Sequence, residues 1–478
     1  IQQMSNKIIA TISGVRFLHD EQFAYNTVNY TNSFGRTLRK ITKNYVQYDF
    51  NQNLVIVGRD GRSVSSQYVP FVLQSLLTQG FDVEYIDIVP TPTVQQTVML
   101  HKAAGAVIIT ASHNGNEWCG LKFLNPSSIF FSPDECEILF SDLQSEAPPT
   151  SQTLEELKVK YSQEKSKNHL KITKNSEILQ EHFEHVAKSS LIKLEQIRSR
   201  NFRVGFNGMC AAGAVYAPLI ANFLNLQLHL FNGTPGELPA HPEPTPANLL
   251  EFQKFLQDKS IDVGFAVDPD ADRIVLTDEN GTIINEEVTL AVAMRYYKSQ
   301  KPLKAFVRNC SSSFLTSIIA GDTEVFESKV GEVNVAMKMI QEGAELGGEG
   351  NGGVILKEAH LGRDSVVAVM LVLSYLADSG KKMSQLIAEF PEMVIQKEKY
   401  AYELGDKPKI LANIEKLGQI SEFQCSMLDG VKLVNPAEKK WVQIRFSNTE
   451  HIFRIIAEAP NKGETGSLIK MVERVVLE

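Results

Sequence analysis

A pattern of strand, small-residue loop, amphipathic helix, strand and motif loop occurs three times along this chain of 478 residues. The copies end in the loops 110–114, 268–273 and 348–353, and apolar segments typical of buried strands precede the first two loops. Strands that alternate with helices predict α/β layers, and ligands of such sheets bind beyond the carboxyl ends of the strands. We therefore expect three similar domains that present three different loops.

The last part of the chain follows a different pattern. After residue 380, alternating segments at 442–445 and 452–457 and a final helix predict an α+β domain with an antiparallel sheet. The polar stretch 151–176 is typical of a solvated helix and linker. The expected fold class is α/β, with three similar mixed-sheet domains and a smaller C-terminal α+β domain. The expected domains are residues 1–150, 151–272, 273–385 and 386–478.

An acidic cluster, Asp268-Pro269-Asp270-Ala271-Asp272, is the strongest sign of chemistry in the chain. Three carboxylates this close repel one another, which favours a bound cation over a solvated turn. Mg²⁺ prefers carboxylate oxygens and keeps free positions for phosphate or water, so the cluster indicates phosphoryl chemistry. A calcium loop is the alternative, because Glu279 is twelfth from Asp268. However, Arg273 stands sixth, where such a loop needs glycine, and a strand rather than a helix precedes the cluster.

Three further segments carry candidate functional residues. Ser112, in Thr110-Ala111-Ser112-His113-Asn114, is a candidate nucleophile, although such loops are also ordinary turns. The glycine-rich segment 348–353 lacks the Walker and Rossmann signatures, so the alternative to a binding loop is a plain turn. The segment 445–454 groups two guanidinium groups, two hydroxyls and an amide, which are the donors that a phosphate dianion requires.

Composition narrows the class of protein. A formal net charge of −8 disfavours a general nucleic-acid binder. The five cysteines include no Cys-x-x-Cys pair, so neither a disulfide framework nor a zinc cage is expected. The most apolar segment, 366–377, is shorter than the ~20 residues that a membrane span needs, and the N-terminus lacks an apolar core of signal-peptide type. We expect a cytoplasmic protein without nucleic-acid or membrane partners.

The four loops, in this order, resemble those of the α-D-phosphohexomutase superfamily, which includes phosphomannomutase/phosphoglucomutase and phosphoglucosamine mutase. The loops 110–114, 268–273, 348–353 and 445–450 are similar to the family's phosphoserine, metal, sugar-binding and phosphate-binding loops, respectively. Shorter similarities occur at 13–16, 58–62, 91–92, 242–244 and 329–331. The resemblance implies three α/β domains and a smaller fourth domain around one central cleft.

The resemblance also implies a reaction and a set of site residues. The reaction is a reversible phosphoryl shift between O1 and O6 of a small-molecule hexose phosphate, with Mg²⁺ as cofactor and a hexose 1,6-bisphosphate as intermediate and activator. Ser112 carries the phosphoryl group, and Lys122 is a candidate proton shuttle if its pKa is lowered. The implied catalytic residues are Ser112, Arg16, Lys122 and His113, and the metal ligands are Asp268, Asp270, Asp272 and Ser112. The implied substrate-binding residues are Arg273, Lys329, Glu349, Asn351, Arg445, Ser447, Asn448, Thr449 and Arg454.

One departure from the family pattern concerns the sugar loop, which commonly ends in Ser-Gly-His but here reads Asn351-Gly352-Gly353. His113 and His360 are the candidates for the missing imidazole. Mannose and glucose phosphates are the favoured substrates, and phosphoglucosamine mutase is the alternative. A metal-dependent sugar phosphatase and an inactive sugar-phosphate-binding protein are alternatives of a different class. The sequence leaves the oligomeric state open.

Overall fold

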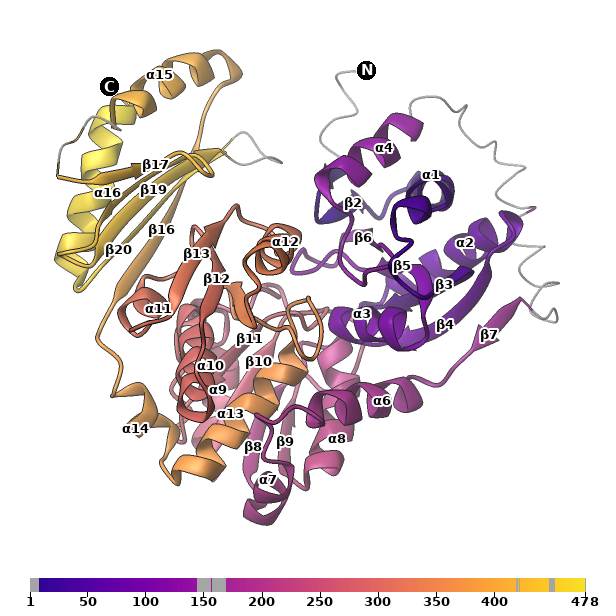
Figure 1. The fold of residues 1–478 in the computed structure, drawn as a ribbon, viewed down its shortest axis with the longest axis horizontal. Coiled ribbons are helices and arrows are strands. Elements are labelled where there is room, and N and C mark those ends of the chain that lie inside the picture. The colour runs from indigo at the N-terminus through magenta and orange to yellow at the C-terminus, as the bar shows by residue number, and fades with distance from the viewer. Residues whose placement is uncertain are drawn as a thin grey trace.

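The computed structural model describes residues 8–143, 156, 169–417, 420, 422–446 and 452–477. The chain forms three α/β units with mixed sheets and a C-terminal unit with an antiparallel sheet, which confirms the expected fold class (Figure 1). The expected linker 151–176 lies largely outside the described residues, and the described end of it forms a strand and the start of a helix.

The first unit contains a seven-stranded sheet. Its strands, in spatial order, are β1 (Ile8–Thr11), β2 (Gly14–Leu18), β6 (Trp118–Leu124), β5 (Ala103–Ile109), β3 (Asn51–Arg59), β4 (Asp82–Ile88) and β7 (Leu170–Ile172). Its helices are α1 (Phe23–Ile41), α2 (Ser65–Thr78), α3 (Thr91–Leu100) and α4 (Pro133–Leu143), with a 3₁₀ turn at Thr42–Asn44. Every residue of β5 is buried, as expected for a parallel strand covered on both faces.

The second and third units each contain a four-stranded sheet. The second has the order β11 (Ile274–Thr277), β10 (Val263–Val267), β8 (Arg203–Asn207) and β9 (Gln227–Phe231), with helices α6 (Asn175–Ala187), α7 (Leu194–Arg200), α8 (Ala212–Leu224) and α9 (Leu250–Gln257) and a 3₁₀ turn at Pro246–Asn248. The third has the order β13 (Glu324–Ser328), β12 (Ala305–Asn309), β14 (Leu346–Glu349) and β15 (Gly353–Leu356), with helices α10 (Glu286–Gln300), α11 (Leu315–Ile318), α12 (Glu332–Glu342), α13 (Ser365–Ser379) and α14 (Met383–Ile387).

The C-terminal unit is an antiparallel sheet. Its strands are β16 (Val394–Ala401), β20 (Ile452–Ala459), β19 (Lys440–Phe446), β18 (Val431–Asn435) and β17 (Gln424–Ser426), accompanied by a 3₁₀ turn at Leu404–Asp406 and by helices α15 (Lys407–Leu417) and α16 (Lys462–Leu477). Both helices pack on the sheet through a separate apolar core.

The three motif loops occupy the same place in the three mixed sheets. In each sheet, the strand before the loop pairs in parallel with one neighbour, and the strand after the loop pairs antiparallel with the strand before it. The strands before and after the loops are β5 and β6, β10 and β11, and β14 and β15. The three loops are therefore hairpin connections at the carboxyl ends of parallel strands, where ligands of α/β sheets bind.

Two expected domain boundaries need correction. The strand β7 follows residue 150 but pairs with β4 in the first sheet. The strand β11 follows residue 272 but pairs with β10 in the second sheet. Backbone hydrogen bonding across each expected boundary is the reason, and we propose boundaries after β7 and after β11 instead.

The helix α13 lies in the core between the second and third units. Residues 365–376 are all buried, and the helix packs against α10 and α7. The apolar composition of this segment is thus explained by burial within the protein. No helix in the described part of the chain is long and apolar enough to cross a membrane.

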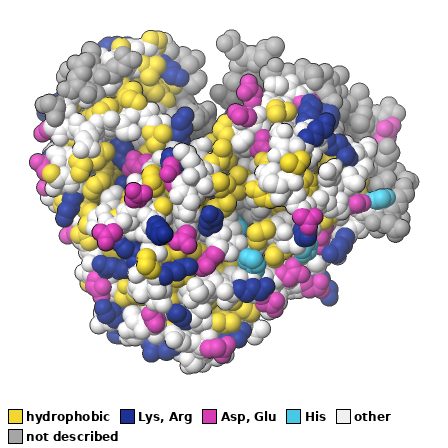
Figure 2. All heavy atoms as spheres, in the orientation of Figure 1, with side chains coloured by type: hydrophobic (Ala, Val, Ile, Leu, Met, Phe, Trp, Pro, Cys, Tyr) yellow, Lys and Arg dark blue, Asp and Glu magenta, His cyan; other side chains and the backbone are white. Residues whose placement is uncertain are grey.

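Charged side chains of both signs are mixed on the face of the molecule that Figure 2 shows. Figure 2 shows Lys and Arg side chains interspersed with Asp and Glu on the face in view. A nucleic-acid binder is recognised by a continuous basic patch, and the described residues on this face form no such patch. All five cysteines are free thiols, and three of them are buried.

The C-terminal unit contacts the third unit through polar groups. Lys397 on β16 places its Nζ 2.8 Å from Oε1 of Glu287 on α10. Glu458 on β20 accepts hydrogen bonds from the Phe314 backbone N–H at 2.6 Å and from Trp441 Nε1 at 2.6 Å. These contacts set the position of β16 and β20 relative to the third sheet.

Glu287 predicts a pH dependence of stability. Burial raises its pKa from the ordinary value of 4.5 to about 7, against the opposing effect of Lys397. The folded chain therefore binds more protons than the unfolded chain between these values. The free energy of unfolding should fall as the pH rises from about 4.5 to about 7, by about 3 kcal/mol at most.

Urea unfolding across this pH range tests the prediction. The variant Glu287→Gln should lose this part of the pH dependence, whereas Glu398→Gln, at an exposed position of β16, should behave like the unmodified protein. The same pH slope in all three proteins would contradict the assignment to Glu287.

Candidate active site

The serine loop places Ser112 in a buried turn between β5 and β6. Ser112 has a φ of +52°, in the left-handed region that a serine seldom adopts, and its backbone N–H donates to Thr110 Oγ1 at 2.9 Å. The Thr110 hydroxyl donates in turn to Oδ2 of Asp60 at 2.7 Å. Backbone strain held by neighbouring hydrogen bonds is common at active sites.

Arg62 holds the same loop, and sequence reasoning gave it no role. Its side chain is fully buried, its Nη2 donates to the Ser112 carbonyl oxygen at 2.6 Å, and its Nη1 donates to the Trp118 carbonyl oxygen at 2.7 Å. Its charge is balanced by Asp60, with Nε to Oδ2 at 2.7 Å. The sequence signal for Arg62 was the motif Gly58-Arg59-Asp60-Gly61-Arg62, which begins at the end of β3, the neighbour of β5 in the sheet.

The three aspartates of the metal loop are completely buried and lie close together. Their carboxylate oxygens come within 4.8 Å of one another. Asp268 Oδ2 accepts from the Ser112 hydroxyl at 3.4 Å, and Asp270 Oδ2 accepts from the Thr91 hydroxyl at 2.7 Å. The structure therefore brings the serine loop and the aspartate triplet to one place, as the sequence predicted.

This cluster fits a bound cation. Burial, and then the charges of Asp272 and Asp270, raise the pKa of Asp268 well above its ordinary value. The Oδ1 atoms of Asp270 and Asp272 are buried and accept no hydrogen bond. Buried carboxylate oxygens without hydrogen bonds are costly, and a hard divalent cation is the partner that such oxygens suit. The described residues thus support a cation site at the triplet.

Lys122 on β6 is buried beside the same carboxylates. Its Nζ lies 2.5 Å from Asp270 Oδ2 and 3.3 Å from Asp272 Oδ2. Burial lowers the pKa of Lys122, but the carboxylates of Asp270 and Asp272 outweigh burial and raise it. Lys122 was a candidate proton shuttle only if its pKa were lowered, and in this arrangement its pKa is raised.

His113 and Arg16 lie beside the serine and the aspartates. The Nδ1 atom of His113 is 3.3 Å from Ser112 Oγ. Burial, and then the positive charges of Arg273 and Arg16, lower the pKa of His113 well below its ordinary value. Arg16 is close enough to Asp270 and Arg273 for their charges to act on its pKa, which burial lowers.

The sugar loop contacts the metal loop directly. The backbone N–H of Ile274 donates to the Gly352 carbonyl oxygen at 3.1 Å. Glu349 is buried, and its Oε1 accepts from Asn309 Nδ2 at 2.7 Å and from the Gly331 N–H at 2.8 Å. Asn351 has a buried Oδ1 that accepts no hydrogen bond. The loop that carries both expected sugar-binding side chains thus lies against the end of the metal loop.

The remaining predicted substrate residues lie near these loops or outside the described residues. Arg273 places its Nε 3.8 Å from both Asp268 Oδ2 and Asp272 Oδ1. Lys329 is exposed, two residues before Gly331. Ser447, Asn448 and Thr449 lie outside the described residues. Arg445 and Arg454 are paired across β19 and β20.

Arg445 is also linked to the sugar loop. Its Nη1 lies 3.6 Å from Oδ2 of Asp429, and the same oxygen accepts from the Val330 N–H at 3.1 Å. Val330 precedes Gly331, which contacts Glu349. The described start of the phosphate loop is therefore connected to the sugar loop through Asp429.

The structure does not support two weaker hypotheses, which are a calcium loop that includes Glu279 and an imidazole of His360 at the sugar site. Glu279 accepts from the Ser384 hydroxyl at 2.6 Å and from its N–H at 3.1 Å, so it contacts α14 and a calcium loop is wrong. His360 is buried, and its Nε2 lies 2.9 Å from Oδ2 of Asp364, the N-cap residue of α13. His182 contacts the same oxygen at 2.8 Å. This arrangement suits a structural junction between α6 and α13 rather than a group that contacts substrate.

Comparisons with known proteins point to the family that the four loops resemble. Family models described as phosphoglucomutase/phosphomannomutase, alpha/beta/alpha domains I, II and III, match residues 13–148, 180–281 and 285–394. A phosphoglucomutase/phosphomannomutase of Thermococcus kodakarensis is 30% identical over 423 residues, covering 87% of this chain and 88% of that protein. A phosphoglucosamine/phosphogalactosamine mutase of Sulfurisphaera tokodaii is 27% identical over 447 residues, covering 91% and 94%.

Solved structures show the same fold. A phosphoglucomutase/phosphomannomutase family protein from Burkholderia thailandensis superimposes with a TM-score of 0.78 at 19% identity, covering 99% of this chain and 97% of that one. The chain thus belongs to the phosphoglucomutase/phosphomannomutase family of the α-D-phosphohexomutase superfamily. The predicted resemblance is confirmed.

A substitution of Asp268 tests the cation site without an activity assay. In metal-free protein, Asp268→Asn keeps the size of the side chain but removes the charge beside Arg273, so the melting temperature of the metal-free variant is its own baseline. Saturating Mg²⁺ should raise the melting temperature of the unmodified protein, because the ion binds only the folded state. The variant should lose most of this increase.

The exposed Asp258 provides the control. Asp258→Asn should keep the full response to Mg²⁺ in the same thermal scan. An undiminished response in Asp268→Asn would place the cation elsewhere.

Proposed function

We propose that the chain is a phosphohexomutase that moves a phosphoryl group between O1 and O6 of a hexose phosphate. The observation that carries the proposal is the contact of 3.4 Å between Ser112 Oγ and Asp268 Oδ2, in a buried cluster with two carboxylate oxygens that accept no hydrogen bond. A serine, a cation site and a sugar loop in mutual contact are the parts that phosphoryl transfer through a phosphoserine requires.

The Mg²⁺ ion would be held by an oxygen of phosphorylated Ser112 and by the carboxylates of Asp268, Asp270 and Asp272. The ion would supply positive charge that neutralises the transferring phosphoryl group. Buried Lys122 and Arg273 keep further positive charge beside the same oxygens. This arrangement excludes water from a charged centre, where each electrostatic interaction is stronger than in solvent.

The chemical step exchanges one P–O bond for another. The bond between phosphorus and Ser112 Oγ breaks as a sugar hydroxyl oxygen bonds to phosphorus, and the hydroxyl loses its proton while Ser112 Oγ gains one. The Nδ1 atom of His113 lies 3.3 Å from Ser112 Oγ, which places it within reach of that proton. The reverse exchange at the other end of the hexose bisphosphate restores the phosphoserine.

The sugar and its second phosphate occupy the remaining loops in this proposal. Glu349 and Asn351 bind sugar hydroxyls, and Lys329 approaches the substrate from the loop before α12. The phosphate that does not react is bound by five residues of the fourth loop: Arg445, Ser447, Asn448, Thr449 and Arg454. The connection from Arg445 through Asp429 to Val330 supports a clamp that faces the sugar loop. The bisphosphate turns over between the two half-reactions and also serves as the activator.

Glucose and mannose phosphates are the proposed substrates, in keeping with the name of the relative from Thermococcus kodakarensis. Glucosamine phosphate is the second candidate, because the relative from Sulfurisphaera tokodaii is named for amino-sugar phosphates. The three sugars differ by one group at C2, so the side chains of the sugar loop decide among them.

A coupled assay with the 1-phosphates of glucose, mannose and glucosamine tests the proposal. With Mg²⁺ and a trace of glucose 1,6-bisphosphate, at least one of these substrates should yield its 6-phosphate. The Ser112→Ala variant should lose at least about 1,000-fold in kcat, because it lacks the hydroxyl that carries the phosphoryl group in this proposal.

Intact mass provides the control for chemistry at Ser112. The unmodified protein should carry one phosphoryl adduct that Ser112→Ala lacks, while Ser63→Ala, in a loop of the first unit, should retain it. Release of inorganic phosphate without any isomerised sugar would identify a phosphatase. Absence of both adduct and turnover would identify a sugar-phosphate-binding protein.

A further inference from the structure

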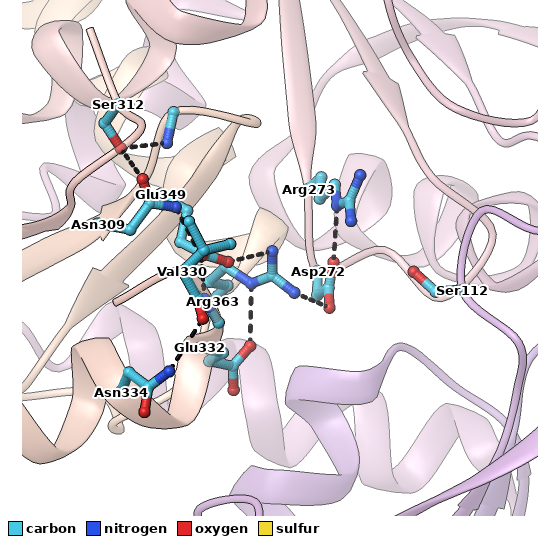
Figure 3. Close-up of polar contacts among 12 residues, drawn as sticks. Ser112, Asp272, Arg273, Asn309, Ser312, Val330, Glu332, Asn334, Glu349 and Arg363 are labelled. Atoms are coloured by element: carbon cyan, nitrogen blue, oxygen red, sulfur yellow. Dashed lines mark hydrogen bonds and ion pairs between the residues drawn. The ribbon is translucent and has the colours of Figure 1, made fainter. Parts of the chain in front are cut away.

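Arg363 lies where the metal loop meets the sugar loop, although the sequence motifs gave it no role. It is buried, with 7% of its surface exposed, and directly precedes the N-cap residue of α13. Its guanidinium contacts three carboxylates: Nη2 lies 2.6 Å from Asp272 Oδ2, Nε lies 3.0 Å from Glu332 Oε2, and Nη1 lies 2.8 Å from Glu349 Oε2. Figure 3 shows Arg363 between these groups, with Ser112 beyond Asp272.

The three carboxylates belong to three separate elements. Asp272 is in the metal loop, Glu332 begins α12, and Glu349 ends β14. A guanidinium group is planar and presents its donors in a rigid fork, so it fixes the relative positions of the acids that it binds. One side chain therefore sets the distance between the cation site and the sugar loop.

Gly353 shares its space with Arg363. Gly353 pairs directly with Glu349 in the β14–β15 hairpin, and opposite residues of an antiparallel pair share a face of the sheet. A Cβ atom at Gly353 would lie 2.2 Å from Arg363 Cδ and 2.8 Å from its Cγ. The φ of Gly353 is outside the left-handed region, so lack of space rather than backbone conformation requires glycine here.

We propose that Arg363 is a positioning residue for phosphoryl transfer: its stem fills the side-chain space of Gly353, and its guanidinium holds Asp272 and Glu349 in register. This inference rests on the proposed function for its kinetic consequence. The sugar loop of this chain has no imidazole at residue 353, and arginine occupies that space. Arginine stays charged at any working pH, so it orients the carboxylates and carries no proton.

A double-substitution cycle tests the contact. The four proteins are the unmodified chain, Gly353→Ala, Arg363→Ala and the double variant. Gly353→Ala should lower the melting temperature and reduce kcat at least tenfold, because the added methyl group displaces the arginine stem. The KM for the hexose phosphate should change less than twofold, since the register of the two loops matters in the transition state. In the Arg363→Ala background the same methyl group should cost almost nothing in either measurement.

Gly466 on α16 supplies the matched control, because a Cβ atom there meets no other atom within 4 Å. Gly466→Ala should leave kcat unchanged. Additive effects of the two substitutions on the melting temperature, or a kcat for Gly353→Ala equal to that of the control, would overturn the proposal. A loss confined to KM would also overturn it.

The design separates this inference from the proposed function. If no hexose phosphate is isomerised by the unmodified protein, the proposed function fails, while the melting temperatures still report whether residues 353 and 363 share one space. If the unmodified protein is active and the cycle is additive, only the inference fails. If Arg363→Ala does not fold, the kcat of Gly353→Ala against the Gly466→Ala control decides, because Gly353→Ala keeps every charge.

Discussion

Three carboxylates buried within one five-residue turn repel one another, and the rest of the structure is arranged around that repulsion. Lys122 from the first unit, Arg273 from the metal loop and Arg363 from the third unit each place a cation within 4 Å of the triplet. Removing one partner of a buried ion pair typically costs about 3–5 kcal/mol. The same charge cluster therefore joins three units of the chain and builds the site where a phosphoryl group is neutralised.

The topology explains why loops far apart in sequence meet. Each mixed sheet ends its parallel part with a hairpin, and the three hairpins carry the serine, the aspartates and the sugar loop. The units also approach one another closely through their backbones. Between the second and third units, the Ile274 N–H donates to the Gly352 carbonyl oxygen. Between the first and second units, a Cβ atom at Gly61 would lie 2.6 Å from the Cα of Ala211. Such approaches need glycine, so the glycines of the motifs belong to the packing between units as much as to the loops.

The sequence predicted the fold class and the strands that lead into the serine and metal loops, because buried strands leave local patterns. It did not predict the strand β14 before the sugar loop. The meeting of Ser112 with Asp268 was expected because loops of α/β sheets gather beyond the carboxyl ends of the strands. The sequence did not predict that β7 and β11 pair across the expected boundaries, since strand pairing depends on distant partners. It also missed Arg62 and Arg363, whose roles come from contacts with residues about 50 and 90 positions away. Lys122 was a candidate proton shuttle only if its pKa were lowered, and the two carboxylates that contact it raise its pKa instead.

The central claim is that Ser112 passes its phosphoryl group to the sugar and takes one back. The most direct measurement is a single-turnover chase of protein labelled with ³²P on Ser112, mixed with unlabelled hexose 1-phosphate and Mg²⁺. The account predicts that the label leaves the protein, appears first in hexose 1,6-bisphosphate and then in hexose 6-phosphate. Label that stays on the protein while product forms, or that appears only as inorganic phosphate, would contradict it.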